Sequence, residues 1–314
     1  MTNLALVGDI GGTNSRFGLL ELGSMDVRDV EVLKNDNFAG LEAAISHYMG
    51  KHGVTELAAA AVDVAAPVDR ELITLTNRPW TFSAESLRLA AKAKQFRLLN
   101  DFEALAWSLP HIAPTDLVQI GGEVKLTPEV KVVLGPGTGL GMATLAPLPG
   151  GGWMPIPGEG GHVTLPIKTA EELALKDKIM GKDHFAEVED VLTGPGLFAL
   201  YRAIAGSAAL QSPEQVMMAG LAGTDIAAVK TLDHFMTFLT RLAGDMAMAL
   251  QARGGVYLAG GIAPSLVEKL KAPKYRAVFE EKGRLSEVMK HIPLYVITDP
   301  FPAFKGCAAA LNAK

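Results

Sequence analysis

The sequence is short of cysteine and of basic residues, and both shortages exclude classes of protein. It holds one cysteine, Cys307, and a lone cysteine forms neither an internal disulfide nor a multi-cysteine zinc site; it suits a reducing compartment. Asp and Glu outnumber Lys and Arg, which gives a net charge of −5. Because no dense basic run is present either, nucleic acid is disfavoured as a partner. We therefore expect no structural zinc and no nucleic-acid binding.

Long hydrophobic runs are absent as well. No stretch of about 18 uncharged apolar residues occurs, and such a stretch is what a membrane-spanning helix needs. The apolar run at residues 57–67 is short and contains Asp63. The N-terminus has no basic segment and reaches Asp9 after few apolar residues, unlike a signal peptide. We expect a soluble, cytoplasmic protein without a membrane contact, and its 314 residues leave room for about two domains.

Two stretches of the sequence, residues 4–22 and 132–145, share one layout. Each has an apolar run, a glycine cluster with one threonine, and a second apolar run. The P-loop pattern G-x-x-x-x-G-K-[ST] does not occur in the chain. A dinucleotide fingerprint requires a helix directly after the glycines, but the segments that follow are short or interrupted by Gly and Pro. Each stretch therefore predicts a strand, a glycine turn and a return strand.

A glycine turn of this kind suits phosphate. Without Cβ atoms the backbone can adopt positive φ and approach a ligand closely, so that successive N–H groups converge on an anion. Thr13 and Thr138 each add a hydroxyl donor. An ordinary tight hairpin is the alternative for either run alone, but two such runs favour phosphate binding. Asp9 precedes the first run and would repel phosphate unless a cation such as Mg²⁺ intervened; a simple turn residue is the alternative.

The remaining pattern predicts an α/β fold with a mixed sheet. Helices are expected over residues 39–53, 83–96 (with Ser83 as N-cap), 101–109, 225–252 and 303–313, with further helices between 169 and 221. Strands are expected at 31–35, 56–65, 97–100, 254–261 and 292–299, besides the two hairpins. The pattern places a tight domain boundary near residue 110. Two related halves, each opened by a glycine hairpin, could hold one polyphosphate between them.

Six motifs now identify a resemblance. They are "DIGGTNSRF" (9–17), "LLNDFEALA" (98–106), "GPGTGLG" (135–141), "PGEGGH" (157–162), "LTGPGL" (192–197) and "LAGGIAP" (258–264). In this order, and over essentially the whole chain, the sequence resembles bacterial ATP-dependent glucokinases of the non-ROK type. That family belongs to the actin and sugar-kinase superfamily.

The resemblance implies a fold and an activity. The fold is α/β, with two RNase H-like (actin/hexokinase-type) domains and a cleft between them. A small domain would comprise residues 1–110 plus 301–314, and a large domain residues 111–300. The implied activity is phosphorylation of D-glucose at its 6-hydroxyl with MgATP, which makes ATP and Mg²⁺ the expected cofactors. A homodimer is implied in the same way.

The resemblance also assigns residues, motif by motif. The first turn implies phosphate and Mg²⁺ contacts for Asp9, Gly11, Gly12 and Thr13, with Asp9 on the metal through water. The later motifs imply phosphate contacts for Gly137, Thr138 and Gly139, adenosine contacts for Gly260 and Gly261, and sugar contacts for Asn100, Asp101, Glu159, His162 and Glu189. Asp101 is the implied general base. Two departures stand out: Glu187 and Asp190 compete with Glu189 for the last role, and Ser15 replaces a frequent alanine, a change expected to be neutral.

The chemistry of these side chains fits a sugar. Each hydroxyl of a bound sugar needs a polar partner once water is excluded, and amide, carboxylate and imidazole groups provide both donors and acceptors. His162 could instead be an ordinary structural histidine, and Asp101 could simply cap the helix that it opens. A carboxylate at the carboxyl end of a strand, however, is where α/β proteins place catalytic groups.

Two other functions stay open at this point. One is a kinase for another hexose, such as mannose or N-acetylglucosamine; the related zinc-containing sugar kinases are excluded because they need a cysteine cluster. The other is a sugar-responsive regulator on the same scaffold. Such regulators carry an N-terminal DNA-binding domain, and an expected first strand beginning at Leu4 leaves no room for one.

Overall fold

A computed structural model describes residues 3–75, 78–124, 127–206 and 209–313. The chain divides into two compact units: unit 1 comprises residues 1–113, 147–157 and 299–314, and unit 2 comprises 114–146 and 158–298. The domain boundaries expected above, 1–110 with 301–314 and 111–300, stay a prediction. No helix in the described part of the chain is long and apolar enough to cross a bilayer.

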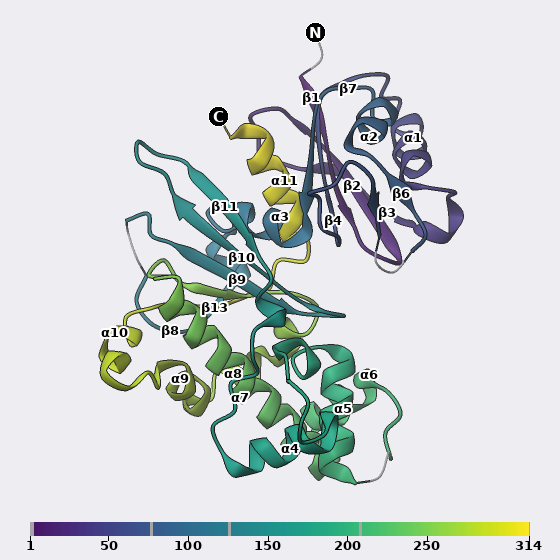
Figure 1. Ribbon diagram of the computed structural model, residues 1–314. Coiled ribbons are helices and arrows are strands. Elements are labelled where there is room, and N and C mark those ends of the chain that lie inside the picture. The colour runs from purple at the N-terminus through teal and green to yellow at the C-terminus, as the bar shows by residue number, and fades with distance from the viewer. Residues whose placement is uncertain (1–2, 76–77, 125–126, 207–208, 314) are drawn as a thin grey trace. The chain divides into compact units, whose positions relative to one another are not determined.

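Unit 1 is built on a five-stranded sheet of order β3-β2-β1-β4-β7. Its elements are β1 (Leu4–Ile10), β2 (Asn14–Glu21), β3 (Arg28–Lys34), a 3₁₀ turn η1 (Asn35–Asn37), α1 (Leu41–Lys51), β4 (Leu57–Val64), β5 (Ile73–Thr74), β6 (Thr81–Phe82), α2 (Ala84–Ala90), β7 (Ala93–Asn100), α3 (Asp101–Ser108) and α11 (Pro302–Asn312). Helices α1 and α2 lie on one face of this sheet, and α3 and α11 on the other (Figure 1).

The pairing of these strands agrees with their sequences. β1 and β2 pair antiparallel across the first glycine turn, with Gly8 opposite Phe17, so the predicted hairpin is confirmed. β1 also pairs parallel with β4, and β4 with β7. A strand covered by helices on both faces must be apolar throughout, and β4 is buried at all but one of its positions.

The helix predicted over residues 83–96 is wrong in its second half. Ser83 caps α2 as predicted, with its side chain accepting from the backbone N–H of Ser86. The helix ends at Ala90, however, because Lys92 adopts a left-handed φ of 47°, which a helix interior does not tolerate. Residues from Ala93 onward form β7 instead. Parallel pairing with β4 overrides the helical preference of the Ala and Lys residues there.

Between residues 114 and 298, the strands of unit 2 pair in the order β10-β9-β12-β13-β8, whereas residues 153–157 of β11 belong to unit 1. The elements in this part of the chain are η2 (Pro114–Asp116), β8 (Leu117–Gly121), β9 (Lys131–Pro136), β10 (Leu140–Pro147), β11 (Trp153–Gly158), η3 (Gly160–His162), α4 (Ala170–Met180), η4 (Val188–Asp190), α5 (Gly194–Ala205), α6 (Pro213–Ala222), α7 (Ile226–Ala249), β12 (Val256–Leu258), η5 (Ala263–Leu266), α8 (Val267–Leu270), α9 (Pro273–Glu280), η6 (Gly283–Leu285), α10 (Ser286–Met289) and β13 (Leu294–Ile297).

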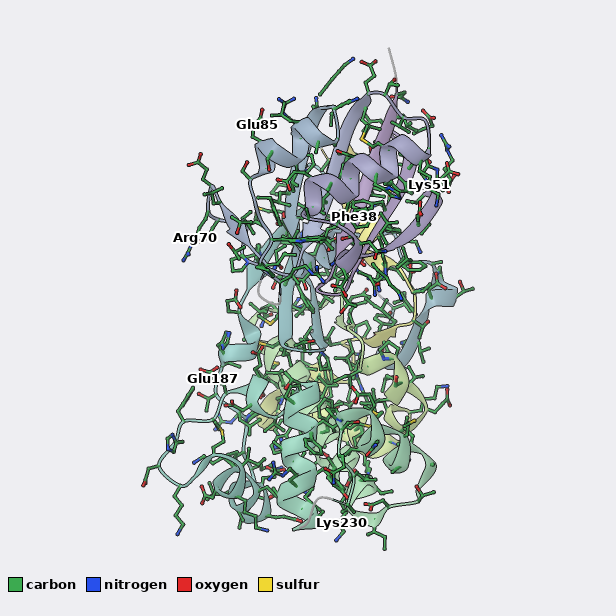
Figure 2. All side chains as sticks on the ribbon, turned by 90° about the vertical axis from the view of Figure 1, so that its right-hand side faces the viewer. Phe38, Lys51, Arg70, Glu85, Glu187 and Lys230 are labelled. Atoms are coloured by element: carbon green, nitrogen blue, oxygen red, sulfur yellow. The ribbon has the colours of Figure 1, made fainter. Side chains whose placement is uncertain are left out.

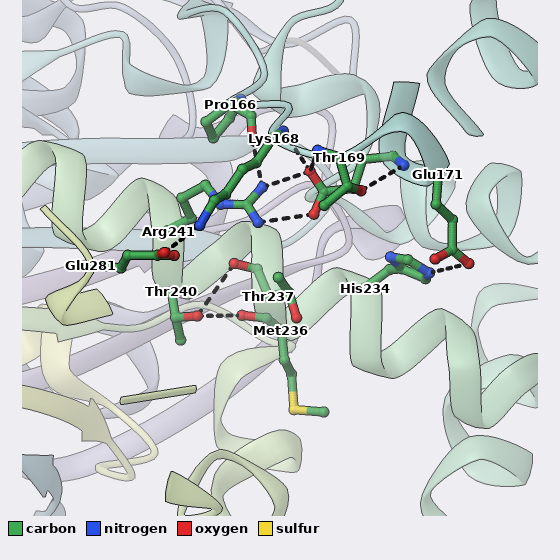
Figure 3. Close-up of polar contacts among 11 residues, drawn as sticks. Pro166, Lys168, Thr169, Glu171, His234, Met236, Thr237, Thr240, Arg241 and Glu281 are labelled. Atoms are coloured by element: carbon green, nitrogen blue, oxygen red, sulfur yellow. Dashed lines mark hydrogen bonds and ion pairs between the residues drawn. The ribbon is translucent and has the colours of Figure 1, made fainter. Parts of the chain in front are cut away.

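Helix α7 organises the core of unit 2, as its apolar spacing predicted. Phe235, Leu239 and Leu242 along it are fully or almost fully buried. Its Arg241 forms a two-pronged ion pair with Glu172 of α4, with both N–O distances 2.9 Å, and also donates to the carbonyl oxygen of Pro166 (Figure 3). Removing one partner of a buried pair like this typically costs about 3–5 kcal/mol. The contact therefore fixes the start of α4 against α7.

Candidate active site

In unit 1, three polar side chains lie at the carboxyl ends of neighbouring strands. Asp9 of β1 pairs in register with Asp63 of β4, and Val64 of β4 with Asn100 of β7. The strands are parallel, so their carboxyl ends meet at one edge of the sheet. This edge is where open α/β sheets bind ligands.

Asp9 is held by an arginine from the opposite strand of the hairpin. The Nη1 atom of Arg16 lies 2.9 Å from the Oδ2 atom of Asp9, and 24% of the Asp9 side chain stays exposed. Burial raises the pKa of Asp9, and the positive charge of Arg16 partly offsets that effect. A partly exposed carboxylate with a cation on one side can bind a metal ion or its water ligand on the other.

Asp63 is a buried acid that the sequence did not single out as functional. It is fully buried, its Oδ2 atom lies 3.4 Å from the sulfur of Cys307, and its Oδ1 atom has no partner among the described residues. Burial raises the pKa of Asp63 well above its usual range, and the nearby Asp9 and Asp101 raise it further. Burial and the two neighbouring carboxylates therefore all favour the uncharged form of Asp63.

Asn100 and Asp101 lie at the start of α3, where their side chains make different contacts. Asn100, not Asp101, is the N-cap, since its Oδ1 atom accepts from the backbone N–H groups of Phe102 (2.9 Å) and Glu103 (3.4 Å). Its Nδ2 atom donates to the carbonyl oxygen of Ala66. Asp101 is the first residue of α3, and its own Oδ1 atom also accepts from the backbone N–H of Phe102, at 3.0 Å. Burial raises the pKa of Asp101 to about 6, with hydrogen bonding to Phe102 acting against this.

The second glycine turn, in unit 2, is packed tightly against a carboxylate. The backbone N–H of Leu140 donates to the Oε2 atom of Glu189 at 2.7 Å. A Cβ atom on Gly139 would stand 2.8 Å from that same oxygen. Positive φ is one reason for glycine in such a turn, but Gly11, Gly12, Gly137 and Gly139 do not have it. At Gly139 the glycine is required for close approach instead.

Gly260 lies beside this turn and does need glycine for its conformation. It has a φ of 77°, and a Cβ atom there would lie 2.6 Å from the carbonyl oxygen of Pro136. The chain continues β12 at this point, with the N–H of Ala259 donating to the carbonyl oxygen of Leu134. Gly260 and Gly261 follow the carboxyl end of β12. They therefore lie at the same edge of the sheet as the second glycine turn, which follows β9.

The "PGEGGH" segment reaches the same region. A Cβ atom on Gly161 would stand 3.0 Å from the Oε2 atom of Glu189, whereas Glu159 and His162 are exposed. His162 pairs with Glu187 at 2.6 Å between Nδ1 and Oε2, and this hydrogen bond raises the pKa of His162. Glu187, labelled in Figure 2, thus has a partner of its own. Glu189 and Glu187 are distinguished by what they contact.

A cavity of about 490 Å³ opens next to the second turn. Its polar lining includes Thr138, Glu187, Glu189 and Asp190, and its apolar lining includes Ile179, Met180, Pro195 and Ala199. All of these residues belong to unit 2. Carboxylates on one side and apolar groups on the other suit a ligand with both hydroxyl groups and C–H surface.

Comparison with known proteins decides the family. The family model described as Glucokinase matches residues 6–314 of the chain. The chain belongs to the glucokinase family. It is 37% identical over 312 residues to a glucokinase of Marinobacter nauticus, covering 98% of this chain and 97% of that one. It is 40% identical over 308 residues to a glucokinase of Chelativorans sp., covering 97% and 90%.

Solved structures of glucokinases have the same fold. A glucokinase from an Antarctic psychrotroph superimposes with a TM-score of 0.89 at 29% identity, covering 99% of both chains. A glucokinase from Balamuthia mandrillaris in complex with glucose gives a TM-score of 0.82 at 24% identity, covering 99% of this chain and 93% of that one. The resemblance and the two-domain actin-like α/β fold class inferred from the sequence are confirmed.

The residues that the glucokinase resemblance assigns fall into two groups, one within each unit. Unit 1 holds Asp9, Gly11, Gly12, Thr13, Asn100 and Asp101, and unit 2 holds Gly137, Thr138, Gly139, Glu159, His162, Glu189, Gly260 and Gly261. Their individual roles stay predictions. In the described part of the chain no group of three or more His, Cys, Asp or Glu side chains could hold a metal ion by itself. Mg²⁺ that arrives with nucleotide phosphates needs only one or two carboxylates.

Arg16 and Asp63 lie at the candidate site in unit 1, and sequence reasoning did not find them. Arg16 lies directly opposite Asp9 in the hairpin register, so counting residues outward from the glycine turn could have found the pair. Asp63 interrupts an otherwise apolar buried strand, and an acid in such a position is itself a signal.

Proposed function

We propose that this chain transfers the γ-phosphoryl group of ATP to the 6-hydroxyl of D-glucose, giving glucose 6-phosphate and ADP. One observation carries the proposal: in a chain of the glucokinase family, Asp101 directly follows a parallel strand, has a pKa of about 6 and begins a helix whose N-cap is Asn100. It is therefore ionised at neutral pH and available to the substrate.

Asp101 acts as the general base. Its carboxylate accepts the proton of the 6-hydroxyl as the O6–P bond forms and the bond from phosphorus to the β–γ bridging oxygen breaks. A base is most effective when its pKa lies near the operating pH, and burial moves Asp101 toward that value.

The two glycine turns bind the phosphates through backbone N–H groups, with the hydroxyls of Thr13 and Thr138 as further donors. Phosphoryl transfer depends mainly on such positioning and on charge stabilisation. Gly260 and Gly261, beside the second turn, lie on the adenosine side. Asp9 would hold Mg²⁺, which when bound would supply positive charge to the transferring phosphoryl group.

Each unit holds candidate ligands for the sugar: Asn100 and Asp101 in unit 1, and Glu159, His162 and Glu189 in unit 2. Nδ2 of Asn100 already donates to Ala66, and its second hydrogen is left for a sugar hydroxyl. Glu189 faces the turn with one oxygen and can offer the other to a hydroxyl. The cavity beside it supplies apolar surface for the C–H groups.

The pH dependence of kcat/KM is expected to follow Asp101. A general base works only when ionised, and its pKa is about 6. The value of kcat/KM should therefore be level above about pH 7 and fall by about tenfold per pH unit below about pH 5. A profile that stays level down to about pH 4.5 would contradict this assignment. It would mean that the base has the ordinary aspartate pKa of about 3.9 and not a raised one.

Glu189→Gln is expected to weaken glucose binding by about tenfold or more. A hydrogen bond to a charged group contributes about 1.5–3 kcal/mol, and glutamine loses the charge. The amide oxygen can still accept from the N–H of Leu140, so the turn is preserved. Calorimetric titration with glucose measures the change, and an unchanged melting temperature shows that the fold is intact.

Glu187→Gln is the matched comparison, two residues away. Sequence reasoning expects it to be near neutral, but the bond from Glu187 to His162 predicts a modest loss. Glutamine can still accept from the imidazole, while the pKa of His162 falls back toward its ordinary value. A larger loss of glucose affinity in Glu187→Gln than in Glu189→Gln would reassign the carboxylate.

One coupled assay tests the proposed function across sugars and donors. With ATP, ADP and polyphosphate offered against glucose, mannose and N-acetylglucosamine, the highest kcat/KM is expected for glucose with ATP. Binding of glucose without turnover by any donor would favour a sugar-responsive protein instead. We also propose a homodimer in the cytoplasm; light scattering on the eluted protein should give twice the 33.2 kDa chain mass.

A further inference from the structure

We propose that Ser15, Asn35 and Arg78 form a clamp that positions the first glycine turn, Gly11–Thr13, for phosphate. The inference rests on the proposed function, since it assumes that this turn binds the nucleotide. None of the three residues is among those that the resemblance assigns to the site. The three come from β2, from the 3₁₀ turn after β3 and from the segment before β6, and all belong to unit 1.

Asn35 holds all three carbonyl groups of the turn. It is fully buried, and its Nδ2 atom donates to the carbonyl oxygens of Gly11 (2.9 Å) and Gly12 (3.2 Å). Its own backbone N–H donates to the carbonyl oxygen of Thr13 at 3.0 Å. One side chain and its backbone therefore fix the orientation of three successive peptide groups.

Ser15 fixes the orientation of Asn35. The Ser15 hydroxyl, also fully buried, donates to the Oδ1 atom of Asn35 at 2.7 Å. With Oδ1 occupied in this way, the Nδ2 atom is directed at the turn, whereas the flipped amide would set oxygen against two carbonyl oxygens. The serine that departs from the family's frequent alanine was expected to be neutral, but it completes this network.

Arg78 holds the turn from a second direction. Its Nε atom donates to the carbonyl oxygen of Gly12 at 3.1 Å, so that oxygen accepts from two side chains. The guanidinium group is itself held by an ion pair with Asp36 and lies 5.0 Å from the centre of the Trp80 ring. Only 17% of the Arg78 side chain is exposed. A positive charge is thus fixed close to the turn.

The clamp determines where the N–H groups of the turn point. In a planar trans peptide the C=O group and the following N–H group point in opposite directions. Tying back the carbonyls of Gly11 and Gly12 therefore turns the N–H groups of Gly12 and Thr13 away from the clamp. Within the described ranges nothing accepts from either of these N–H groups. Such preorganised free donors are what a phosphate group requires.

Equilibrium binding of ADP and of glucose, each measured by calorimetry without turnover, tests the clamp. The variants are Ser15→Ala, Asn35→Asp and Arg78→Gln. Asn37→Asp and Arg70→Gln are the matched controls: Asn37 is an exposed residue of the same 3₁₀ turn, and Arg70 projects from the surface (Figure 2). Loss of one orienting hydrogen bond predicts about 2- to 10-fold weaker ADP binding in the three variants, with glucose affinity unchanged and both controls like the parent.

Each outcome decides for or against the clamp. Weakened ADP binding in Ser15→Ala alone supports it even if Asn35→Asp fails to fold, because Ser15→Ala removes only one buried hydroxyl. Equal losses of ADP and glucose affinity together with a lower melting temperature would show a merely structural role and overturn it. ADP binding like that of the parent in all three variants would overturn it too. If the parent protein binds no ADP at all, the result contradicts the proposed function itself, and the clamp proposal, which rests on it, is overturned as well.

Discussion

Asp101→Asn is expected to lower kcat by about 10²–10⁴, the usual contribution of a general base. Asparagine has the same shape and can still meet the 6-hydroxyl, but it cannot accept the proton. Asn100 caps α3, so the substitution leaves the cap in place. Glucose should bind within about tenfold of the parent affinity, since Asp101 supplies only one of the hydrogen bonds to the sugar.

Glu103→Gln is the matched control for this experiment. Glu103 is a second acid in the first turn of α3, so both variants lose one negative charge near the same helix N-terminus. Only Asp101→Asn should lose activity by orders of magnitude. A folded Asp101→Asn protein that keeps more than about a tenth of the parent kcat would remove Asp101 from the mechanism, leaving positioning and Mg²⁺ to carry the transfer.

Removal of divalent cations is expected to abolish activity, and added Mg²⁺ to restore it. The reason is electrostatic: Asp9 and Asp101 lie close enough to affect one another's ionisation, and nucleotide phosphates brought to the adjacent turn would be repelled by them. A cation carried by the nucleotide offsets that repulsion. Activity in a chelator titration, with and without excess MgCl₂, measures the effect.

The fold should be unaffected by the chelator, and circular dichroism with a melting curve checks this. Asp9→Asn should raise the Mg²⁺ concentration needed for half-maximal activity. Full activity in excess chelator would contradict the role given to Asp9. Stoichiometric zinc in the purified protein would contradict the expectation that the chain needs none.

Local patterns predicted much of the fold. Both glycine hairpins, the buried strand β4 and the long helix α7 follow from apolar periodicity and turn residues, which act within a few positions of one another. The same reasoning failed where contacts with a segment distant in the sequence determine the secondary structure. Residues 93–96 form a strand because β4 lies alongside. Strands β8 and β11 and the short helices α8, α9 and α10 were not predicted, since each is brief and depends on its neighbours in space.

The candidate site was predictable in its motifs but not in its contacts. Asp9 and Asp101 could be found because Asp9 lies near the end of one apolar strand and Asp101 directly follows another. That Asp63 lies between them depends on the parallel register of β1, β4 and β7, which no local pattern encodes. The bond from Glu187 to His162 joins residues 25 positions apart, and the clamp on the first turn joins residues up to 66 positions apart.

The most direct test of the account follows the phosphorus itself. Purified protein, glucose and MgATP are mixed and observed by ³¹P nuclear magnetic resonance. We expect the γ-phosphate signal of ATP to be replaced by equal amounts of ADP and a phosphate monoester, whose coupling to the two C6 protons identifies glucose 6-phosphate. Unchanged ATP, free inorganic phosphate alone, or an ester coupled to the C1 proton would contradict the assignment.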